Sequence, residues 1–238
     1  MNESIKQSKR GYYPDDEKNF SETSLETLRL AAKHIQYLIN EGYSIKNSSV
    51  FVGNHFLLSE RQRLALVRSI STEEQLRQRK EKECTGKDLC RQTVFIDGFN
   101  TIITLEIALS DSLLLKCMDG TIRDLAGLRG TYRVIDKTAG AVQVIAEVLK
   151  EWKVKKAVFY LDAPVSNSGR LKSLIVDVWK AYDIELDVMV INDVDKTLQE
   201  QAYVITSDAI ILDKCKSWFN LNALCLEKIS VQPIQIWS

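Results

Sequence analysis

The chain has 238 residues, 45% of them hydrophobic, so it can bury a core as one large domain or as a small and a medium domain. Its 32 basic residues balance 32 acidic ones, which excludes a global positive field but leaves room for local patches. Five cysteines without CxxC spacing and two histidines argue against a structural zinc site and a disulfide framework.

The N-terminal segment is polar and lacks the apolar stretch of a secretory signal. No apolar run approaches the roughly 20 residues that a membrane-spanning helix needs. We therefore expect a cytoplasmic protein that does not bind membranes.

The first third of the chain predicts helices. Residues 21–40 place apolar side chains near the helical period after a capping pattern at Ser24, and Gly42 ends this helix. A second helix is predicted to start at Ser59, and the chain has almost no apolar content after Ser71, where we expect a connection between domains. The predicted division is a small, mostly helical N-terminal domain (1–71), a charged linker (72–90) and an α/β domain (91–238).

The rest of the chain alternates short apolar runs with stretches of helical periodicity. Apolar runs that alternate with helices indicate a mainly parallel sheet covered on both sides. Asp119-Gly120, between short apolar segments, predicts a hairpin inserted after the first of these helices. The predicted strands are 93–96, 157–161, 186–191 and 202–206, and the predicted helices are near 100–109, 138–152, 168–182, 194–201 and 208–219.

Aspartates follow each of the four predicted strands. Ligands of open parallel sheets bind beyond the carboxyl ends of the strands, so these side chains are expected to meet at one edge. Like charges at close range disfavour ionisation unless a cation neutralises them, and Mg²⁺ or Mn²⁺ takes oxygen ligands of this kind. The aspartates are Asp97, Asp162, Asp193 with Asp195, and Asp208.

Each aspartate taken alone has a simpler explanation. Asp is a favoured helix N-cap, and loops that lead from a strand into a helix commonly end with it. Asp97 is therefore either the cap of the helix that follows or the first member of an acidic metal site. Capping alone does not account for acids at four strand ends.

Three segments carry a resemblance to a known family. "VFIDGFN" resembles the first motif of the NYN branch of PIN-like nucleases, and "VFYLDAP" is similar to the second acidic strand end of that fold. "NDVDKTLQEQAYVITSDAIILD" resembles the last acidic motifs of PIN domains. The resemblance covers about residues 90–226 and implies a three-layer α/β/α domain.

The whole chain also resembles a prokaryotic family that joins a small domain of unknown function to such a C-terminal domain. The segments "RGYYPDDEKNF", "FVGNHFLLSERQR", "IDGFNTIITLE" and "DGTIRDLAGLRGTYR" carry this likeness. It implies a fold and a suspected activity only.

The PIN-like resemblance implies a divalent-metal-dependent nuclease that hydrolyses RNA phosphodiester bonds, with Mg²⁺ or Mn²⁺ as cofactor and RNA as partner. A homodimer is left open. PIN domains carry a second acid on an early helix, and here Glu106 is either that acid or a solvated residue. The implied catalytic and metal-binding acids are Asp97, Asp162, Asp195 and Asp208, with Asp213 as a further metal ligand.

The arginine-rich stretch after the hairpin suggests contacts to nucleic acid. Arginines donate forked hydrogen bonds to phosphates, and Tyr132 is available for stacking on a base. The alternative is a solvated loop whose arginines pair with Asp119 and Asp124. A similar choice between RNA contact and solvation applies to Arg61, Arg63 and Arg68. The predicted substrate-binding residues are Asn100, Arg123, Arg129, Arg133 and Ser207.

Two other functions remain open. One is a catalytically inactive, PIN-like regulatory module that binds RNA or a nucleotide. The uncertain identity of the second acid favours this alternative. The other is a phosphatase with an aspartyl nucleophile. That chemistry usually needs a second Asp two residues after the first, whereas Gly98 and Phe99 follow Asp97.

Overall fold

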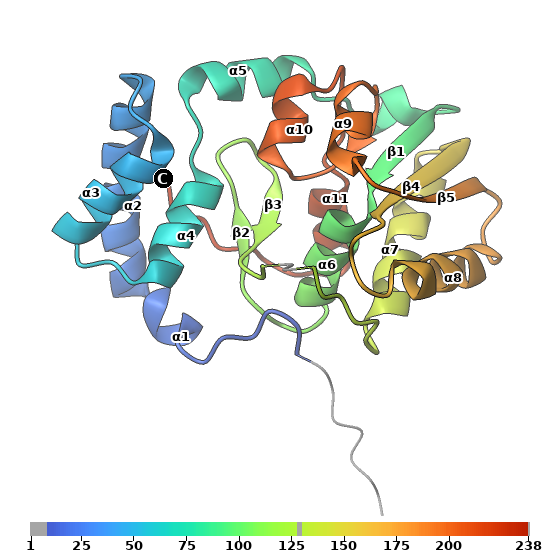
Figure 1. Ribbon diagram of the computed structural model, residues 1–238, viewed down its shortest axis with the longest axis horizontal. Helices are drawn as coiled ribbons and strands as arrows, with labels where there is room; N and C mark the ends of the chain where they lie inside the picture. Colours follow the sequence, from blue (N-terminus) through green and yellow to red (C-terminus); the bar gives the residue numbers. More distant parts are fainter. Residues whose placement is uncertain (1–8, 128–129, 238) are drawn as a thin grey trace, which may run out of the picture.

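The computed structural model describes residues 9–127 and 130–237 and shows an α/β protein (Figure 1). In these residues a four-stranded sheet has the order β5-β4-β1-β6 with every neighbouring pair parallel, as the alternating pattern predicts. Its strands are β1 (Thr93–Asp97), β4 (Lys156–Asp162), β5 (Glu185–Ile191) and β6 (Val204–Ile205).

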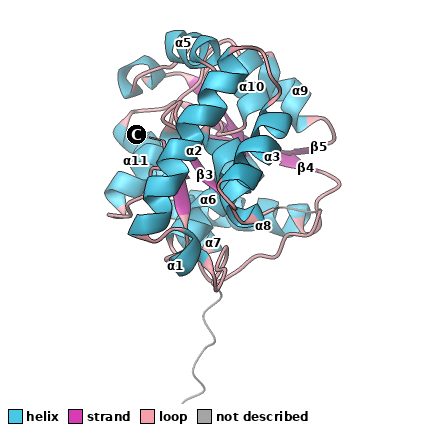
Figure 2. Ribbon diagram, turned by 90° about the vertical axis from the view of Figure 1, so that its left-hand side faces the viewer, coloured by secondary structure: helices cyan, strands magenta, loops and turns pink. Residues whose placement is uncertain are grey.

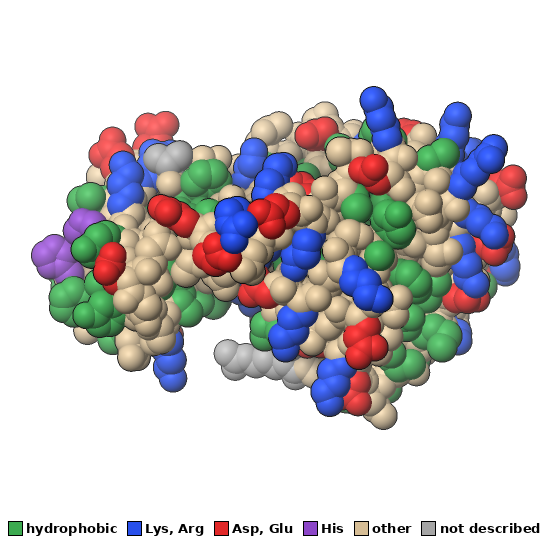
Figure 3. Space-filling model, turned by 90° about the horizontal axis from the view of Figure 1, so that it is seen from above, with side chains coloured by type: hydrophobic (Ala, Val, Ile, Leu, Met, Phe, Trp, Pro, Cys, Tyr) green, Lys and Arg blue, Asp and Glu red, His purple; other side chains and the backbone are tan. Residues whose placement is uncertain are grey.

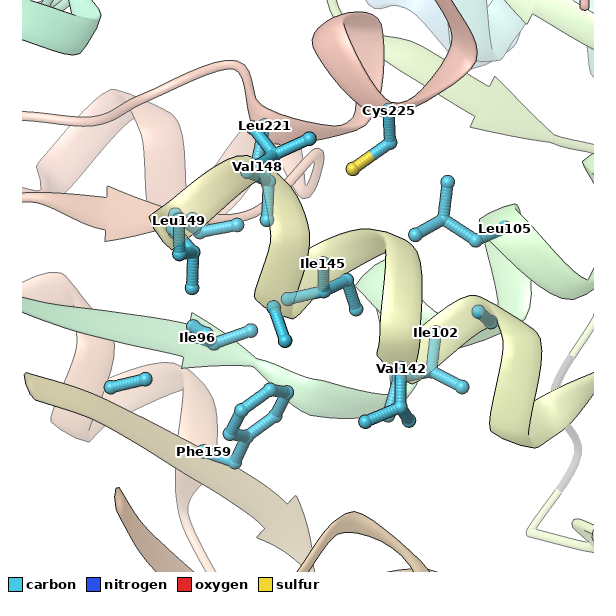
Figure 4. Packing of buried hydrophobic residues seen from close by; sticks show 14 of the residues in the cluster. Ile96, Ile102, Leu105, Val142, Ile145, Val148, Leu149, Phe159, Leu221 and Cys225 are labelled. Atoms are coloured by element: carbon cyan, nitrogen blue, oxygen red, sulfur yellow. The ribbon is translucent and has the colours of Figure 1, made fainter. Parts of the chain in front are cut away.

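Helices lie on both faces of the sheet, and Figure 2 shows them enclosing the strands. Ile96 of β1 and Phe159 of β4 belong to the larger core, together with Ile102 and Ile145 (Figure 4). Because successive strand residues point to opposite faces, Phe95 packs on the other side. The first face is covered by α6 (Gly98–Ala108), α7 (Thr138–Glu151), α8 (Ser168–Trp179) and α11 (Leu221–Lys228), and the second by α9 (Val194–Gln199) and α10 (Ala209–Lys214).

A second core lies under the N-terminal helices α2 (Glu22–Asn40), α3 (Ile45–His55) and α4 (Glu60–Ser69), and Phe20, which follows the short helix α1 (Asp16–Asn19), also belongs to it. Helix α2 is capped by Ser21, whose hydroxyl accepts from the Ser24 amide, so the predicted cap at Ser24 was wrong. Helix α3 was not predicted. In the described residues, no helix combines the length and the apolar character needed to cross a membrane.

An antiparallel hairpin and the C-terminal tail complete the second core. The hairpin, β2 (Leu114–Lys116) and β3 (Ile122–Asp124), turns at Gly120 with a φ of 81°, as Asp119-Gly120 predicts. It contributes Leu115 and Cys117, and the tail contributes Ile236. The Lys116 amide donates to the Ile234 carbonyl. Residues far apart in sequence therefore build one core from the N-terminal helices, the hairpin and the tail.

The charged segment 72–90, expected as a linker, contains α5 (Glu73–Glu81) and the 3₁₀ helix η1 (Gly86–Leu89). The long helix predicted from Ser59 is divided, because Thr72 and Gln75 form a capping box that starts a new helix. Arg79 of α5 is 1% exposed, and its carbonyl accepts from the Trp218 indole. This connection is packed against the body of the protein.

Candidate active site at the carboxyl edge of the sheet

The chain changes direction across the sheet between β1 and β6. From β1 it proceeds through β4 to β5, and it then crosses by way of α9 to β6 on the opposite side of β1. Ligands of open α/β sheets bind outside the carboxyl ends of the strands at such a switch point. Asp97 ends β1 and Thr206 follows β6, and their side chains are hydrogen-bonded at 2.8 Å.

Asp97 does not cap the helix that it precedes. It occupies the N-cap position of α6, but its side chain accepts no capping hydrogen bond from that helix. Its Oδ2 accepts instead from Asn100 Nδ2 at 2.6 Å and from Thr206 Oγ1. Asp97 is only 2% exposed. Thr206 was not singled out from sequence, although it stands two residues before Asp208.

Burial raises the pKa of Asp97 from 3.8 to about 7, and the charges of Asp208 and Asp162 add to this rise. The hydrogen bonds from Asn100 and Thr206 oppose it by stabilising the carboxylate. Near neutral pH this carboxyl therefore gains or loses a proton readily.

The other three predicted acids belong to the same electrostatic cluster. Burial raises the pKa of Asp162, and the charge of Asp195 adds to it. Burial likewise raises the pKa of Asp195, with a contribution from Asp208. These acids follow the ends of the four strands, with Asp195 in the first turn of α9, and each one interacts with two others. We call them the acid ring: Asp97, Asp162, Asp195 and Asp208.

Capping explains one of the four. Both Ile210 and Ile211 donate their amides to Asp208 Oδ1, at 2.8 and 3.1 Å, so Asp208 is the N-cap of α10. Asp193 stands apart from the acid ring. Its side chain is 73% exposed and lies 3.8 Å from Lys196 Nζ.

The acid ring has the donor chemistry for a hard cation but not the form of a closed cage. Among the described residues, no group of three or more His, Cys, Asp or Glu side chains is arranged as a ready metal-binding set. Mg²⁺ keeps several waters and is usually held by one or two carboxylates together with substrate phosphates. Carboxyls that raise one another's pKa fit such an open site, because a cation relieves their repulsion.

Two predicted acids lie elsewhere. Asp213, expected as a metal ligand, pairs with Arg79 Nε at 2.7 Å and accepts from Gln75 Nε2 at 3.2 Å, so it turns toward α5. Glu106 is neither a second acid of the ring nor solvated. It is fully buried near the end of α6 and pairs with Arg10 Nε at 2.7 Å.

Tyr132 is not available for stacking on a base. It is fully buried, and its hydroxyl donates to Glu106 Oε1 at 2.8 Å. Its backbone amide and carbonyl bind Ser166 and Asn167, which follow β4. Tyr132 therefore anchors its loop against the end of β4.

The predicted substrate-binding residues have different surroundings. Arg123 is nearly buried and donates to Ser207 O, Arg68 O and Asp119 Oδ2, so the expected pair with Asp119 exists but is not solvated. Arg133 is exposed, and its carbonyl receives a hydrogen bond from Arg10. The prediction for Arg129 lies outside the described residues.

A pocket of about 380 Å³ adjoins the acid ring. The sheet domain contributes Asn100, Ser207 and Asp208 to its wall, and the hairpin contributes Arg123. The N-terminal unit reaches it through α4. Its remaining lining residues are Val67, Arg68, Ile103, Asp124, Ala126 and Ala209.

Gly98 permits the close approach of β1 and β4 at the site. A Cβ there would lie 2.5 Å from Leu161 Cδ2 and 2.9 Å from the Tyr160 carbonyl oxygen. We expect Gly98→Ala to lower the free energy of unfolding by about 1–3 kcal/mol, because the Tyr160 backbone cannot yield freely. Urea denaturation measures this, with Gly169→Ala as control, since a Cβ at Gly169 meets nothing within 4 Å. A Gly98→Ala protein as stable as the wild type would contradict the expectation.

The chain matches two family models. The family described as "Domain of unknown function (DUF5616)" matches residues 86–224, and the one described as "Protein of unknown function (DUF434)" matches residues 27–82. The chain is 34% identical over 186 residues to "Uncharacterized protein MJ0935" of Methanocaldococcus jannaschii, an alignment that covers 78% of this chain and 89% of the relative. No solved structure matches the chain. The DUF5616 match spans more than half of the chain and contains the whole acid ring, so the protein belongs to the DUF5616 family.

Proposed function

We propose that this protein is a PIN-like, divalent-metal-dependent nuclease that hydrolyses RNA phosphodiester bonds. The observation that carries the proposal is the acid ring at the switch point of the sheet, with Asp97 buried and its pKa raised to about 7. Paired carboxylates beside a pocket with basic residues suit a substrate that brings both a negative charge and a bound cation.

Each residue of the site has a role in this proposal. Mg²⁺ or Mn²⁺, held by Asp97 with Asp208 or Asp162, would supply Lewis-acid stabilisation of the charge on the phosphate. Asn100 and Thr206 fix the orientation of Asp97. Asp195 is partly exposed with a raised pKa, so it can accept the proton of the attacking water.

One observation favours a second function. Glu106, the candidate for the second acid of a PIN domain, is held away from the acid ring by Arg10 and Tyr132. A chain without this acid fits a catalytically inactive PIN-like module that binds RNA or a nucleotide. Such a module predicts binding that survives replacement of the acids.

The test is cleavage of labelled single-stranded RNA with Mn²⁺ by the wild type and by Asp97→Asn and Asp208→Asn. We expect each variant to lose at least about 100-fold in rate, the low end for a positioned proton-transfer group. Asn at position 208 can still cap α10, so the change removes charge rather than the helix. Asp193→Asn is the matched control, because it removes an exposed carboxylate two residues before Asp195 and should retain full activity.

The outcomes separate the two functions. Equal cleavage by the wild type and both acid variants would overturn the nuclease proposal. RNA binding without cleavage, unchanged in Asp97→Asn, would instead establish the inactive module.

A further inference from the structure

The N-terminal helical unit places one arginine in the pocket beside the acid ring. Helix α4 carries three arginines, and two of them are bound to N-terminal segments, one of them also to the Leu125 carbonyl just after β3. Arg61 binds both carboxylate oxygens of Asp16, and Arg63 donates to the Leu58 carbonyl and to Asn54. Arg68 alone among the three lines the pocket.

Arg68 retains hydrogen-bond donors that the described part of the chain does not use. Its Nη1 donates to the Asp124 carbonyl and lies 3.5 Å from Asp124 Oδ1, while its Nε and Nη2 have no partner among the described residues. The side chain is 32% exposed. Arg123, the other arginine of the pocket, already donates from each guanidinium nitrogen to protein acceptors. Of the two arginines that the described residues bring to the pocket, Arg68 is therefore the one with donors left for a ligand.

The face of the molecule that carries α5 and α10 shows no broad basic patch in addition to this local charge (Figure 3). Viewed from the side of α5 and α10, Lys and Arg side chains are interspersed with Asp and Glu (Figure 3). The formal net charge is zero. An anionic chain molecule must therefore be held by specific contacts rather than by a general field.

We infer that the pocket is a subsite for one nucleotide of single-stranded RNA, with Arg68 binding its phosphate next to the acid ring. Val67 and Ile103 give the pocket an apolar wall for the sugar or base, and Asn100 and Ser207 offer polar groups between that wall and Asp208. A volume of about 380 Å³ lies within the usual range for small-ligand sites. The inference rests on the proposed function for its substrate class, and it makes the N-terminal unit part of the active site.

The experiment measures fluorescence anisotropy of labelled oligouridylate, about ten nucleotides long. Full-length Asp97→Asn protein in Mg²⁺ is the background, so that cleavage does not interfere. Adding Arg68→Gln is expected to weaken binding about 10-fold, as for one lost hydrogen bond to a charged group, and to reduce the salt-dependence slope by about 0.7. Adding Val67→Trp, which fills the pocket without a change of charge, should weaken binding by a similar factor while the slope changes little.

Arg77→Gln is the matched control. It removes the same charge from the N-terminal half, but Arg77 is 60% exposed and pairs with Glu74 and Glu81 along α5. Its affinity should stay within twofold of the background protein. Thermal unfolding of each variant shows whether the fold persists, and Val67→Trp tests the pocket even if Arg68→Gln disturbs the contact with Asp124.

The results distinguish failure of the subsite from failure of the nuclease. If the wild type cleaves RNA but the Arg68→Gln and Val67→Trp proteins bind the oligonucleotide as tightly as the control, the subsite is overturned and the nuclease proposal stands. Arg68-dependent binding without wild-type cleavage supports the subsite and overturns the nuclease. Absence of oligonucleotide binding by the background protein overturns the subsite, whatever the cleavage result.

Discussion

At pH 8 without metal, we expect the free energy of unfolding of Asp97→Asn to exceed that of the wild type by roughly 2–4 kcal/mol. A rise in pKa from 3.8 to about 7 corresponds to about 4 kcal/mol, and relaxation around the charged side chain reduces this. The amide oxygen of Asn can still accept from Asn100 and Thr206, so the substitution removes the buried charge and retains the hydrogen bonds.

The effect has a defined pH window. Folded wild-type protein binds the Asp97 proton more tightly than the unfolded chain does, so its stability falls as the pH rises from about 4 to about 7 and is constant above that. Asn carries no charge at any pH. The difference between the two proteins should therefore be near zero at about pH 4, grow through pH 5 and 6, and level off near pH 7.

Urea denaturation at pH 5, 6, 7 and 8 measures this difference, with Asp193→Asn as control. Asp193 is exposed, so its replacement should give no comparable change. A gap between wild type and Asp97→Asn that does not vary with pH would show that Asp97 is not held as a strained carboxylate. Under the proposed function, Mn²⁺ should stabilise the wild type more than Asp97→Asn, because the substitution removes one of the carboxylates that would hold the ion.

The sequence was sufficient to find the acid ring because the evidence for it is local. An apolar run followed by Asp marks the carboxyl end of a buried strand, and parallel pairing brings those ends to one edge. Asp97, Asp162 and Asp208 were found in this way. The helix-capping alternative was correct for Asp208 and wrong for Asp97, a difference that depends on side-chain direction.

Other features depend on contacts between distant segments. Asp213 stands five residues after Asp208, and only the packing of α5 against α10 shows that it turns to Arg79. Glu106 is paired with Arg10, which lies almost a hundred residues earlier. Helix α3 was missed because "SSVFVGN" combines serines, β-branched residues and a glycine, all of which weaken helix propensity.

Arg79→Met is expected to lower the free energy of unfolding by about 3–5 kcal/mol, the cost of removing one partner from a buried ion pair. Arg79 Nη1 lies 2.6 Å from Asp119 Oδ2, and both side chains are almost fully buried. The residue also bonds Asp213 and Ser71. Met keeps much of the volume of the Arg79 side chain but leaves the Asp119 and Asp213 carboxylates and the Ser71 hydroxyl without the guanidinium that binds them. Six of the nine residues of α5 are charged, and nothing in that sequence indicates that one arginine is buried.

Arg77→Met, two positions earlier on α5, provides the comparison. Its side chain is 60% exposed, and its pairs with Glu74 and Glu81 are surface pairs that solvent screens, so they contribute little to stability. Urea denaturation of both variants at neutral pH should therefore separate them by at least about 2 kcal/mol. Equal stability would mean that α5 is a loosely attached connection. A large difference in stability between the two variants would show that Arg79 joins α5 to the hairpin through Asp119. Asp119 also pairs with Arg123, which donates to the Ser207 carbonyl beside the acid ring.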